Sequence, residues 1–278
     1  NPDADNDNGT YCSYDGGDYS LSFDGIDDYV EINEVNNLLR PVNEITYSSW
    51  AYSTNWTEGT MRYILSNSQG AGYSIGLNHP ASGKVGCQIR TGDNVYIQAY
   101  HDLSDLNNNQ YHNFTCVYQD GDIEIYVDGD LKDVTYSDAN GIWNSAVPLL
   151  FGSEPAPTPE DNSFFYLGFI DEIKIWDRAL SDEEILQNFM EDNFDIGNES
   201  LVGHWDFNDA PGGFLVDITG NGNNGTITNG ADWSNETPVI GCLDEEATNY
   251  NPNANMDMGG CLYYEGSIWN VSNDGDDV

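Results

Sequence analysis

GFIDEIKIWDRALSDEEI, residues 168–185, is the stretch that decides the fold of this chain. From Phe169 to Trp176 apolar residues nearly alternate with charged ones. This is the pattern of a strand with one buried face, because successive side chains leave opposite faces of a sheet. The strand also carries the adjacent carboxylates Asp171 and Glu172, which are costly inside a sheet unless positive charge meets them.

A short helix is expected directly after this strand. Ser181 and Glu184 have the spacing of a capping box, in which the two side chains satisfy backbone N–H groups of the first turn. An apolar stripe follows, formed by Ile185, Leu186 and Phe189. The stretch therefore predicts a strand that continues into a capped helix.

The rest of the chain repeats the strand pattern many times. Runs of alternating or β-favouring residues, separated by turn signals, are expected to be strands. They cover residues 19–23, 29–32, 45–53, 62–66, 73–77, 84–89, 95–99, 112–118, 123–127, 201–207 and 225–228. Asp128-Gly129 is typical of a tight hairpin turn. With a single helix expected, the sequence predicts an all-β sandwich of two antiparallel sheets.

Charge restricts the function of the chain. Seven Lys and Arg face 48 Asp and Glu, a formal net charge of −41. Such a chain will not bind nucleic acid or an anionic membrane by electrostatics, and no apolar run is long enough for membrane insertion. Two explanations of the acidity stay open together. One is a solvated surface suited to high salt, and the other is a set of Ca²⁺ sites, since Ca²⁺ takes oxygen ligands.

A repeat divides the chain into units. NPDADNDNGTYC (1–12) is similar to NPNANMDMGGC (251–261), and the later copy is preceded by GCLDEEATNY. We therefore expect a piece of a tandem array. Its expected parts are the end of a linker module, one large domain, a complete linker module and the start of a further domain. These parts cover residues 1–18, 19–237, 238–264 and 265–278.

Five cysteines in an acidic, lysine-poor chain favour a secreted, extracellular or cell-surface location. Cys242 and Cys261 are expected to close the complete linker module, which leaves Cys12 without an internal partner. Cys87 and Cys116 both lie in strand patterns. They are either a disulfide between strands or two buried thiols, and the sequence leaves both possibilities open.

Three stretches carry a family resemblance: SLSFDGIDDYVEI (20–32), IEIYVDGDLK (123–132) and the stretch quoted first. They resemble the signature stretches of laminin-G-like, concanavalin A-type jelly rolls, and the resemblance covers roughly residues 19–235. It implies a jelly-roll sandwich. The module around Cys242 is similar to small disulfide-closed linkers in large secreted proteins of marine Bacteroidota.

Residues 201–227 also resemble this family, in which such a segment usually opens the domain. Here the segment follows the helix. Either it completes the same sandwich or it is a partial second unit. We favour the first alternative, because the segment is too short to bury a core of its own.

The resemblance also implies a structural calcium ion. In related laminarinase-type jelly rolls, an Asp of the final strand binds Ca²⁺ together with backbone oxygens near the first strand, and Asp171 matches that position. Asp24, Asp27 and Asp28 of FDGIDD are expected nearby. The alternative is a carboxylate that only accepts backbone N–H groups. Calcium is favoured, since a buried unpaired carboxylate would otherwise take up a proton.

A second loop, DITGNGNNG (217–225), offers oxygen ligands for a cation from Asp217, Asn221 and Asn223. A plain turn explains its composition equally well. The acidic segment Asp3-Ala-Asp5-Asn-Asp7 also resembles a calcium loop, but its glycine falls one position late for an EF-hand. It is a better signal for a linker.

Aromatic residues divide into two groups. Those on strand patterns are expected to fill the core: Trp50, Trp176 and Trp205. Those in or near loops are candidates for stacking on a sugar ring: Trp56, Tyr96, Tyr100, His101 and Trp143.

No catalytic pattern is present. The glucanase relatives carry two Glu in an E-x-D-x-x-E string, which this sequence lacks, and there is no H-E-x-x-H or G-x-S-x-G. We therefore expect a non-catalytic extracellular adhesion or recognition repeat that binds glycans or cell-surface or matrix proteins. The alternatives are a structural spacer or filament subunit that contacts copies of itself, and an accessory carbohydrate-binding domain of a polysaccharide-degrading enzyme.

Overall fold

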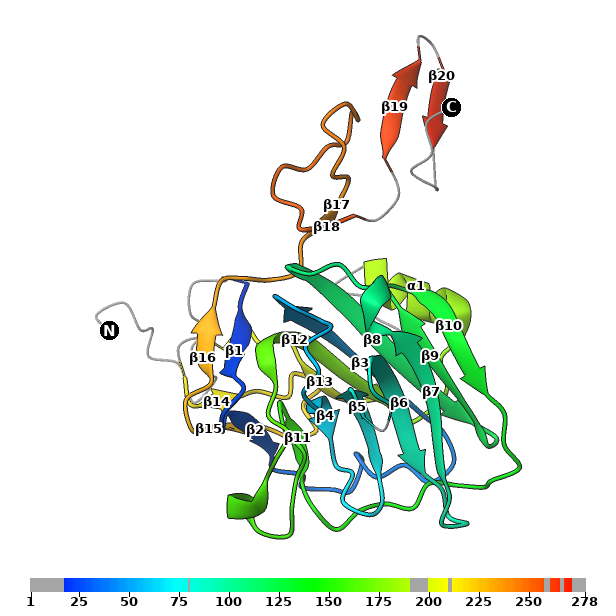
Figure 1. Ribbon diagram of the computed structural model, residues 1–278, viewed down its shortest axis with the longest axis vertical. Coiled ribbons are helices and arrows are strands. Elements are labelled where there is room, and N and C mark those ends of the chain that lie inside the picture. Colours follow the sequence, from blue (N-terminus) through cyan, green and yellow to red (C-terminus); the bar gives the residue numbers. More distant parts are fainter. Residues whose placement is uncertain are drawn as a thin grey trace.

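Two eight-stranded antiparallel sheets pack face to face in the computed structural model, which describes residues 18–79, 81–190, 200–209, 212–257, 261–265 and 268–271 (Figure 1). Sheet A has the order β10 (Asp130–Thr135), β9 (Asp122–Val127), β8 (Gln110–Gln119), β3 (Ile45–Ser53), β12 (Leu167–Trp176), β1 (Ser20–Asp24) and β16 (Asp232–Ser234), and β13 (Leu201–Trp205) also pairs with β12. Sheet B has the order β14 (Phe214–Leu215), β15 (Gly225–Thr228), β2 (Tyr29–Ile32), β11 (Leu149–Phe151), β4 (Arg62–Ser66), β5 (Tyr73–Leu77), β6 (Lys84–Arg90) and β7 (Tyr96–Asp102). The predicted all-β, two-sheet jelly-roll sandwich is confirmed.

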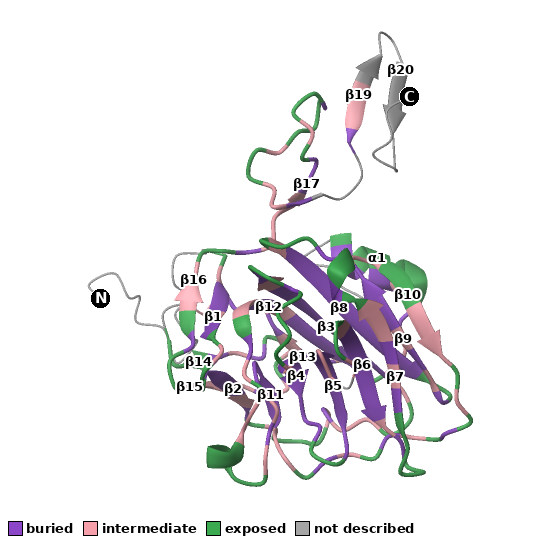
Figure 2. Cartoon of the chain, viewed as in Figure 1, coloured by how far each residue is buried: buried purple, intermediate pink, exposed green. Residues whose placement is uncertain are grey.

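The core lies between the two sheets, and Figure 2 shows in purple that most residues of the central strands are buried. Strand β5 illustrates how the sequence builds it, because Tyr73, Ile75 and Leu77 belong to the main apolar cluster while Ser74 and Gly76 alternate with them. Burying a large apolar side chain in this way contributes about 1.5–3 kcal/mol. The alternation is thus what holds the sheets together.

The segment from β13 to β16 completes this sandwich. Strand β13 pairs with β12, β15 pairs with β2, and β16 pairs with β1. The first of the two alternatives for residues 201–227 is therefore confirmed. The short strands β11, β14 and β16 were not expected from the sequence, since each has only two or three residues and no alternation to reveal it.

The helix α1 (Asp182–Met190) lies on the outer face of sheet A. Its predicted capping box is present, because Ser181 N–H donates to Glu184 Oε2 at 2.9 Å and Glu184 N–H donates to Ser181 Oγ at 3.4 Å. Trp50 stacks on Phe189 of the helix at 5.4 Å between ring centroids. Trp50 and Trp176 are buried as expected, but in side clusters near the helix and not between the sheets.

A small module follows the sandwich. Its strands β17 (Ile240–Gly241) and β18 (Met256–Asp257) are parallel, and Cys242 and Cys261 form its expected disulfide. A hairpin of β19 (Leu262–Glu265) and β20 (Ile268–Val271) comes next. The expected earlier linker copy, with its acidic calcium-like segment and Cys12, lies outside the described residues, as does most of the expected start of a further domain. Two short 3₁₀ turns, Leu103–Asp105 and Pro159–Asp161, complete the elements.

Within the described part of the chain, the structure contains no helix that is long and apolar enough to cross a membrane.

Candidate functional site

The strand that decides the fold is interrupted at its two carboxylates. Strand β12 pairs with β1 up to Ile170 and with β13 from Ile173 onward. Between these points its register against β3 shifts, and Glu172 has a left-handed backbone with φ of 47°. Such a bulge redirects side chains and locally ends strand pairing. Asp171 and Glu172 therefore occupy a junction among β1, β12 and β13.

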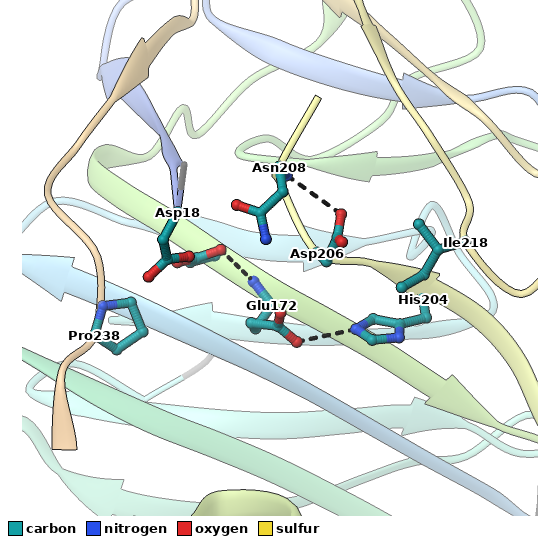
Figure 3. Close-up of a pocket in the computed structure, with 8 residues that line it drawn as sticks. Asp18, Glu172, His204, Asp206, Asn208, Ile218 and Pro238 are labelled. Carbon is teal, nitrogen blue, oxygen red and sulfur yellow. Dashed lines mark hydrogen bonds and ion pairs between the residues drawn. The ribbon is translucent and has the colours of Figure 1, made fainter. Parts of the chain in front are cut away.

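A pocket of about 180 Å³ opens at this junction. It is lined by Asp18, Asp171, Glu172, His204, Asp206, Asn208, Ile218 and Pro238. Figure 3 shows carboxylates from separate segments around the same space. Asp18 directly precedes β1, while Asp206 and Asn208 directly follow β13, so the junction itself assembles the pocket.

Asp171 is the most enclosed of these carboxylates, with 1% of its surface exposed. Its Oδ1 accepts the Glu172 N–H at 2.8 Å, but its Oδ2 is buried and has no hydrogen-bond partner in the described structure. Burial, followed by the charges of Glu172 and Asp18, raises the pKa of Asp171 well above its ordinary value. An orphaned buried oxygen of this kind needs a proton or a cation.

Asp18 shows a similar deficit of positive charge. Burial raises its pKa, a hydrogen bond with Thr237 opposes this rise, and the charges of Glu172 and Asp206 add to it. Glu172 differs, because its Oε2 lies 2.9 Å from His204 Nε2 and 3.1 Å from Lys174 Nζ. Burial pushes the pKa of Glu172 upward, but these two partners outweigh it and lower the pKa overall. The negative charge of Glu172 is thus already compensated by partners within the chain.

The donor set left in the pocket suits a hard cation. Asp18, Asp171 and Asp206 contribute carboxylate oxygens, which are the ligands Ca²⁺ prefers. The chemistry of these donors suits the calcium ion that the family resemblance implies, although among the described residues only Asp24, Asp27 and Asp28 bring three carboxylate oxygens within 4.8 Å of one another.

The acids of FDGIDD lie away from the Asp171 pocket and not beside it, while their own role as cation ligands stays a prediction. Leu21 pairs with Ile170 and Asp24 with Leu167, so Asp24 and Asp171 lie at opposite ends of β1, roughly 13 Å apart along the strand. Oxygens of Asp24, Asp27 and Asp28 do lie within 4.8 Å of one another. However, Asp28 accepts the Asp24 N–H and Asp24 accepts the N–H two residues on, so two of these carboxylates close a turn.

The loop with Asp217 uses its polar groups internally. Asp217 Oδ1 accepts from His204 N–H and from both the N–H and hydroxyl of Thr219, and Oδ2 accepts the Asn223 N–H at 3.0 Å. Asn221 and Asn223 both donate to the backbone oxygen of Val202. These internal hydrogen bonds favour the simpler interpretation as a turn, and the cation site at Asp217, Asn221 and Asn223 stays a prediction.

Trp56 was expected to be a sugar-stacking residue, and this is wrong. Only 1% of it is exposed, its Nε1 donates to Asn107 O at 3.0 Å, and its ring meets Phe114 edge to face. The tryptophan follows a strand but folds back into the main core.

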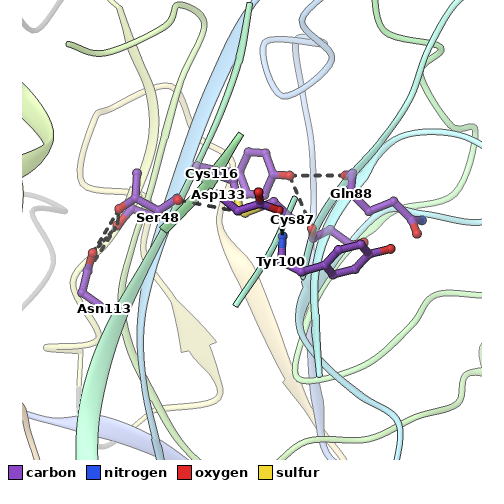
Figure 4. Close-up of a disulfide and its surroundings, with 10 residues drawn as sticks. Ser48, Cys87, Gln88, Tyr100, Asn113, Cys116 and Asp133 are labelled. Carbon is purple, nitrogen blue, oxygen red and sulfur yellow. Dashed lines mark hydrogen bonds between the residues drawn. A yellow bond between two sulfur atoms is a disulfide. The ribbon is translucent and has the colours of Figure 1, made fainter. Parts of the chain in front are cut away.

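Tyr100 and His101 face different surroundings on β7. The Tyr100 hydroxyl donates to Gln98 Oε1 at 2.7 Å, and its N–H donates to Asp133 of the neighbouring sheet at 2.9 Å. Figure 4 shows this edge, beside the disulfide that joins Cys87 of β6 to Cys116 of β8. Burial, and then the charge of Lys132, lowers the His101 pKa. Both residues are half-buried, and the open question of the two cysteines resolves to a disulfide.

Tyr96 and Trp143 are brought together by Arg90. The guanidinium carbon lies 4.3 Å from the Tyr96 ring centroid and 5.5 Å from that of Trp143. Trp143 N–H donates to Arg90 O at 2.8 Å, and Trp143 O accepts the Gly72 N–H at 2.7 Å, so strand-like bonds fix the tryptophan. Tyr96 is 37% exposed and Trp143 47%. We call Arg90, Tyr96 and Trp143 the aromatic platform.

Sequence reasoning missed Asp18, Asp206, Asn208 and Arg90. Asp206 and Asn208 had a usable signal, since WDFND continues the alternation of β13 with polar residues on one side. Arg90 had one local signal, because Tyr96 is its cross-strand partner in the hairpin of β6 and β7, whereas Trp143 comes from a distant loop.

Comparisons with known proteins agree with this fold. The family described as the concanavalin A-like lectin/glucanases superfamily, Laminin_G_3, matches residues 24–186. No curated protein matches the chain. A proposed carbohydrate-binding protein from Bacteroides ovatus has a similar structure with a TM-score of 0.60 and 16% identity, over 78% of this chain and 59% of that protein. This chain thus spans 59% of its length.

Two further structures are similar at lower scores. A pentraxin of Limulus polyphemus has a TM-score of 0.45 and 14% identity, over 61% of this chain and 81% of its own. Domains LG4–5 of the mouse laminin α1 chain have a TM-score of 0.44 and 15% identity, over 59% of this chain and 44% of that one. The family match covers well over half of the residues, and the chain belongs to the laminin-G-type branch of the concanavalin A-like lectin/glucanase superfamily.

Proposed function

We propose that this chain is a non-catalytic, extracellular carbohydrate-binding repeat whose jelly roll is stabilised by Ca²⁺. The observation that carries the binding role is the aromatic platform, where two exposed rings from β7 and from the loop before β11 are held by one arginine. Exposed rings of fixed orientation supply flat apolar contact at low entropic cost, which suits the apolar face of a sugar ring. The Bacteroides ovatus protein, by its name, is compatible with this role.

Calcium would bind in the pocket of Asp171. Asp18, Asp171 and Asp206 would hold the ion, and it would supply the positive charge that the orphaned Asp171 oxygen lacks. These ligands come from the segment before β1, from β12 and from the segment after β13. The residues would therefore tie the first strand to the later ones, and the role of the ion is stability.

The same residues argue against hydrolysis. Glycoside hydrolysis needs two carboxyl groups that both face the substrate. Asp171 is enclosed and Glu172 is engaged by His204 and Lys174, so neither is free to transfer a proton to a bound glycan. Asp171 and Glu172 are better assigned to stabilising the sheet.

The extracellular assignment rests on the two disulfides and on the acidic composition. The repeated linker sequence supports a place in a longer array, with the sandwich at 19–237 and the linker module at 238–264. Glycans of cell surfaces or matrix are the ligands we expect such an array to meet.

Affinity electrophoresis through gels that contain single polysaccharides tests the proposal. We expect at least one polysaccharide to retard the protein, and Trp143→Ala to weaken binding about 30-fold, as for an aromatic hot spot worth about 2 kcal/mol. Tyr136→Ala is the matched control, because Tyr136 is 77% exposed and lies outside the platform. No retardation in a broad panel, with calcium present, would contradict the proposal and favour a spacer role.

A further inference from the structure

One cation of this chain stands apart from all the others. Six of its seven Lys and Arg residues form an ion pair with a carboxylate: Arg40, Arg62, Lys84, Lys132, Lys174 and Arg178. Arg90 is the seventh, and none of the described residues gives it a carboxylate partner. In a chain with 48 acidic residues, a half-exposed cation without such a partner is unexpected.

The surroundings of Arg90 keep it available. A guanidinium has five N–H donors. Nη2 donates to Asn94 Oδ1, while the buried Nε has no hydrogen-bond partner in the described part of the chain. Asp93 is close in sequence, but its carboxylate accepts the N–H of Asn140 and forms no ion pair with Arg90. The rings of Tyr96 and Trp143 both contact the guanidinium group.

We infer that the aromatic platform selects a sugar that carries a negative charge, either a carboxylate as in a uronic acid or a sulfate ester. Arg90 would bind the anionic group through its planar fork of donors, and Trp143 or Tyr96 would stack on the sugar ring. Charge-assisted, bidentate contacts of this kind are among the strongest polar contacts available to a side chain. The inference rests on the proposed carbohydrate-binding function and names the ligand class of that same platform.

The net charge of −41 does not oppose this assignment at close range. Repulsion between an anionic sugar and distant carboxylates is screened beyond about 8 Å at physiological ionic strength. A direct guanidinium contact, partly shielded by two rings, is screened much less. Specificity then follows from the one unpaired cation and not from the average charge of the surface.

Isothermal titration with a matched pair of oligosaccharides tests the inference. The first ligand is an oligouronate, and the second is the same oligosaccharide with its carboxylates reduced to primary alcohols. We expect the wild-type protein to bind the charged form at least tenfold more tightly. Arg90→Gln should abolish this preference, so that the charged and the reduced forms bind with equal affinity, even if loosening of the two rings weakens both. Arg90→Lys, which keeps charge but loses the fork, should keep only part of the preference.

Lys132→Gln is the control, because Lys132 is an exposed cation already paired with Asp130. A sulfated galactan oligosaccharide and its desulfated form distinguish a sulfate ester from a carboxylate in the same design. Equal wild-type affinity within both pairs, or an unchanged preference in Arg90→Gln, would overturn the anionic selectivity while leaving carbohydrate binding intact. Absence of binding to all four sugars would overturn both proposals. Binding of polyaspartate as tight as that of the oligouronate would assign the platform to an acidic protein and overturn the sugar assignment.

Discussion

Replacing Asp171 by Asn tests the calcium site directly. The amide has the shape of the carboxylate and can still accept the Glu172 N–H, but it removes the buried charge that a cation would neutralise. Calcium at 100 times its dissociation constant stabilises the native state by about 2.7 kcal/mol. For a chain of this size, each kcal/mol raises Tm by about 2–4 °C, so we expect calcium to raise the wild-type Tm by roughly 5–10 °C.

Asp171→Asn should lose this response. In chelator its Tm should equal or exceed that of the wild type, because the variant has no buried acid that must either take up a proton or carry a charge beside Glu172 and Asp18. Asp24→Asn is the comparison variant, because its carboxylate belongs to the separate cluster of Asp24, Asp27 and Asp28, whose oxygens lie within 4.8 Å of one another. We expect it to keep the full calcium response, because the ion we propose lies at Asp171.

Differential scanning calorimetry in about 1 M NaCl, where the Debye length is about 3 Å, separates specific binding from general screening of the net charge. Magnesium at the same concentration should act more weakly, because it demands a tighter octahedral shell. An equal calcium response in wild type and Asp171→Asn would refute the reasoning, as would a response lost only in Asp24→Asn.

Three further predictions concern stability. In chelator, the raised pKa of Asp171 lets the native protein keep a proton at pH values where the unfolded chain has released it. The free energy of unfolding, measured by urea titration, should therefore fall as the pH rises from about 4 toward that raised pKa. Replacing both Cys87 and Cys116 by Ala opens a cross-link with a sequence separation of 29 and should cost about 3–4 kcal/mol, and an unchanged urea midpoint would contradict this. Gly168 has φ of 141°, and a Cβ there would lie 2.0 Å from Tyr52 O, so Gly168→Ala should cost more than about 2 kcal/mol of stability by the same assay.

Much of the fold could be predicted from local patterns. The alternation of residues 168–176, the capping box at Ser181 and the Asp128-Gly129 turn each depend on neighbours within a few residues, and all three appear in the structure. Strand β14 could not be predicted, because its two residues are too few to show alternation. It is a strand only through its pairing with β15. Local chemistry determines strands, while long-range pairing determines which short segments become strands.

The candidate sites show the same division more sharply. The sequence identified Asp171 as a buried acid in need of a cation, which follows from its place in a half-buried strand. It expected the FDGIDD acids near Asp171, but the register between β1 and β12 places Asp24 opposite Leu167, away from Asp171. Register is set by long-range pairing and cannot be derived from either strand alone. The prediction for Trp56 was wrong for a related reason. A loop tryptophan can fold back into the core when its indole N–H donates to a backbone oxygen, as Trp56 does to Asn107.

In our proposals, the two sites divide stability from recognition. The Asp171 pocket lies where β12 changes partners inside sheet A, and an ion there would add no exposed contact for a large ligand. The aromatic platform lies at the end of β6 and the start of β7 in sheet B, where Trp143 is fixed by backbone hydrogen bonds that do not involve the pocket. Because the disulfide from β6 to β8 and the shared core hold the sheets together, the platform needs the sandwich intact but needs no ion of its own.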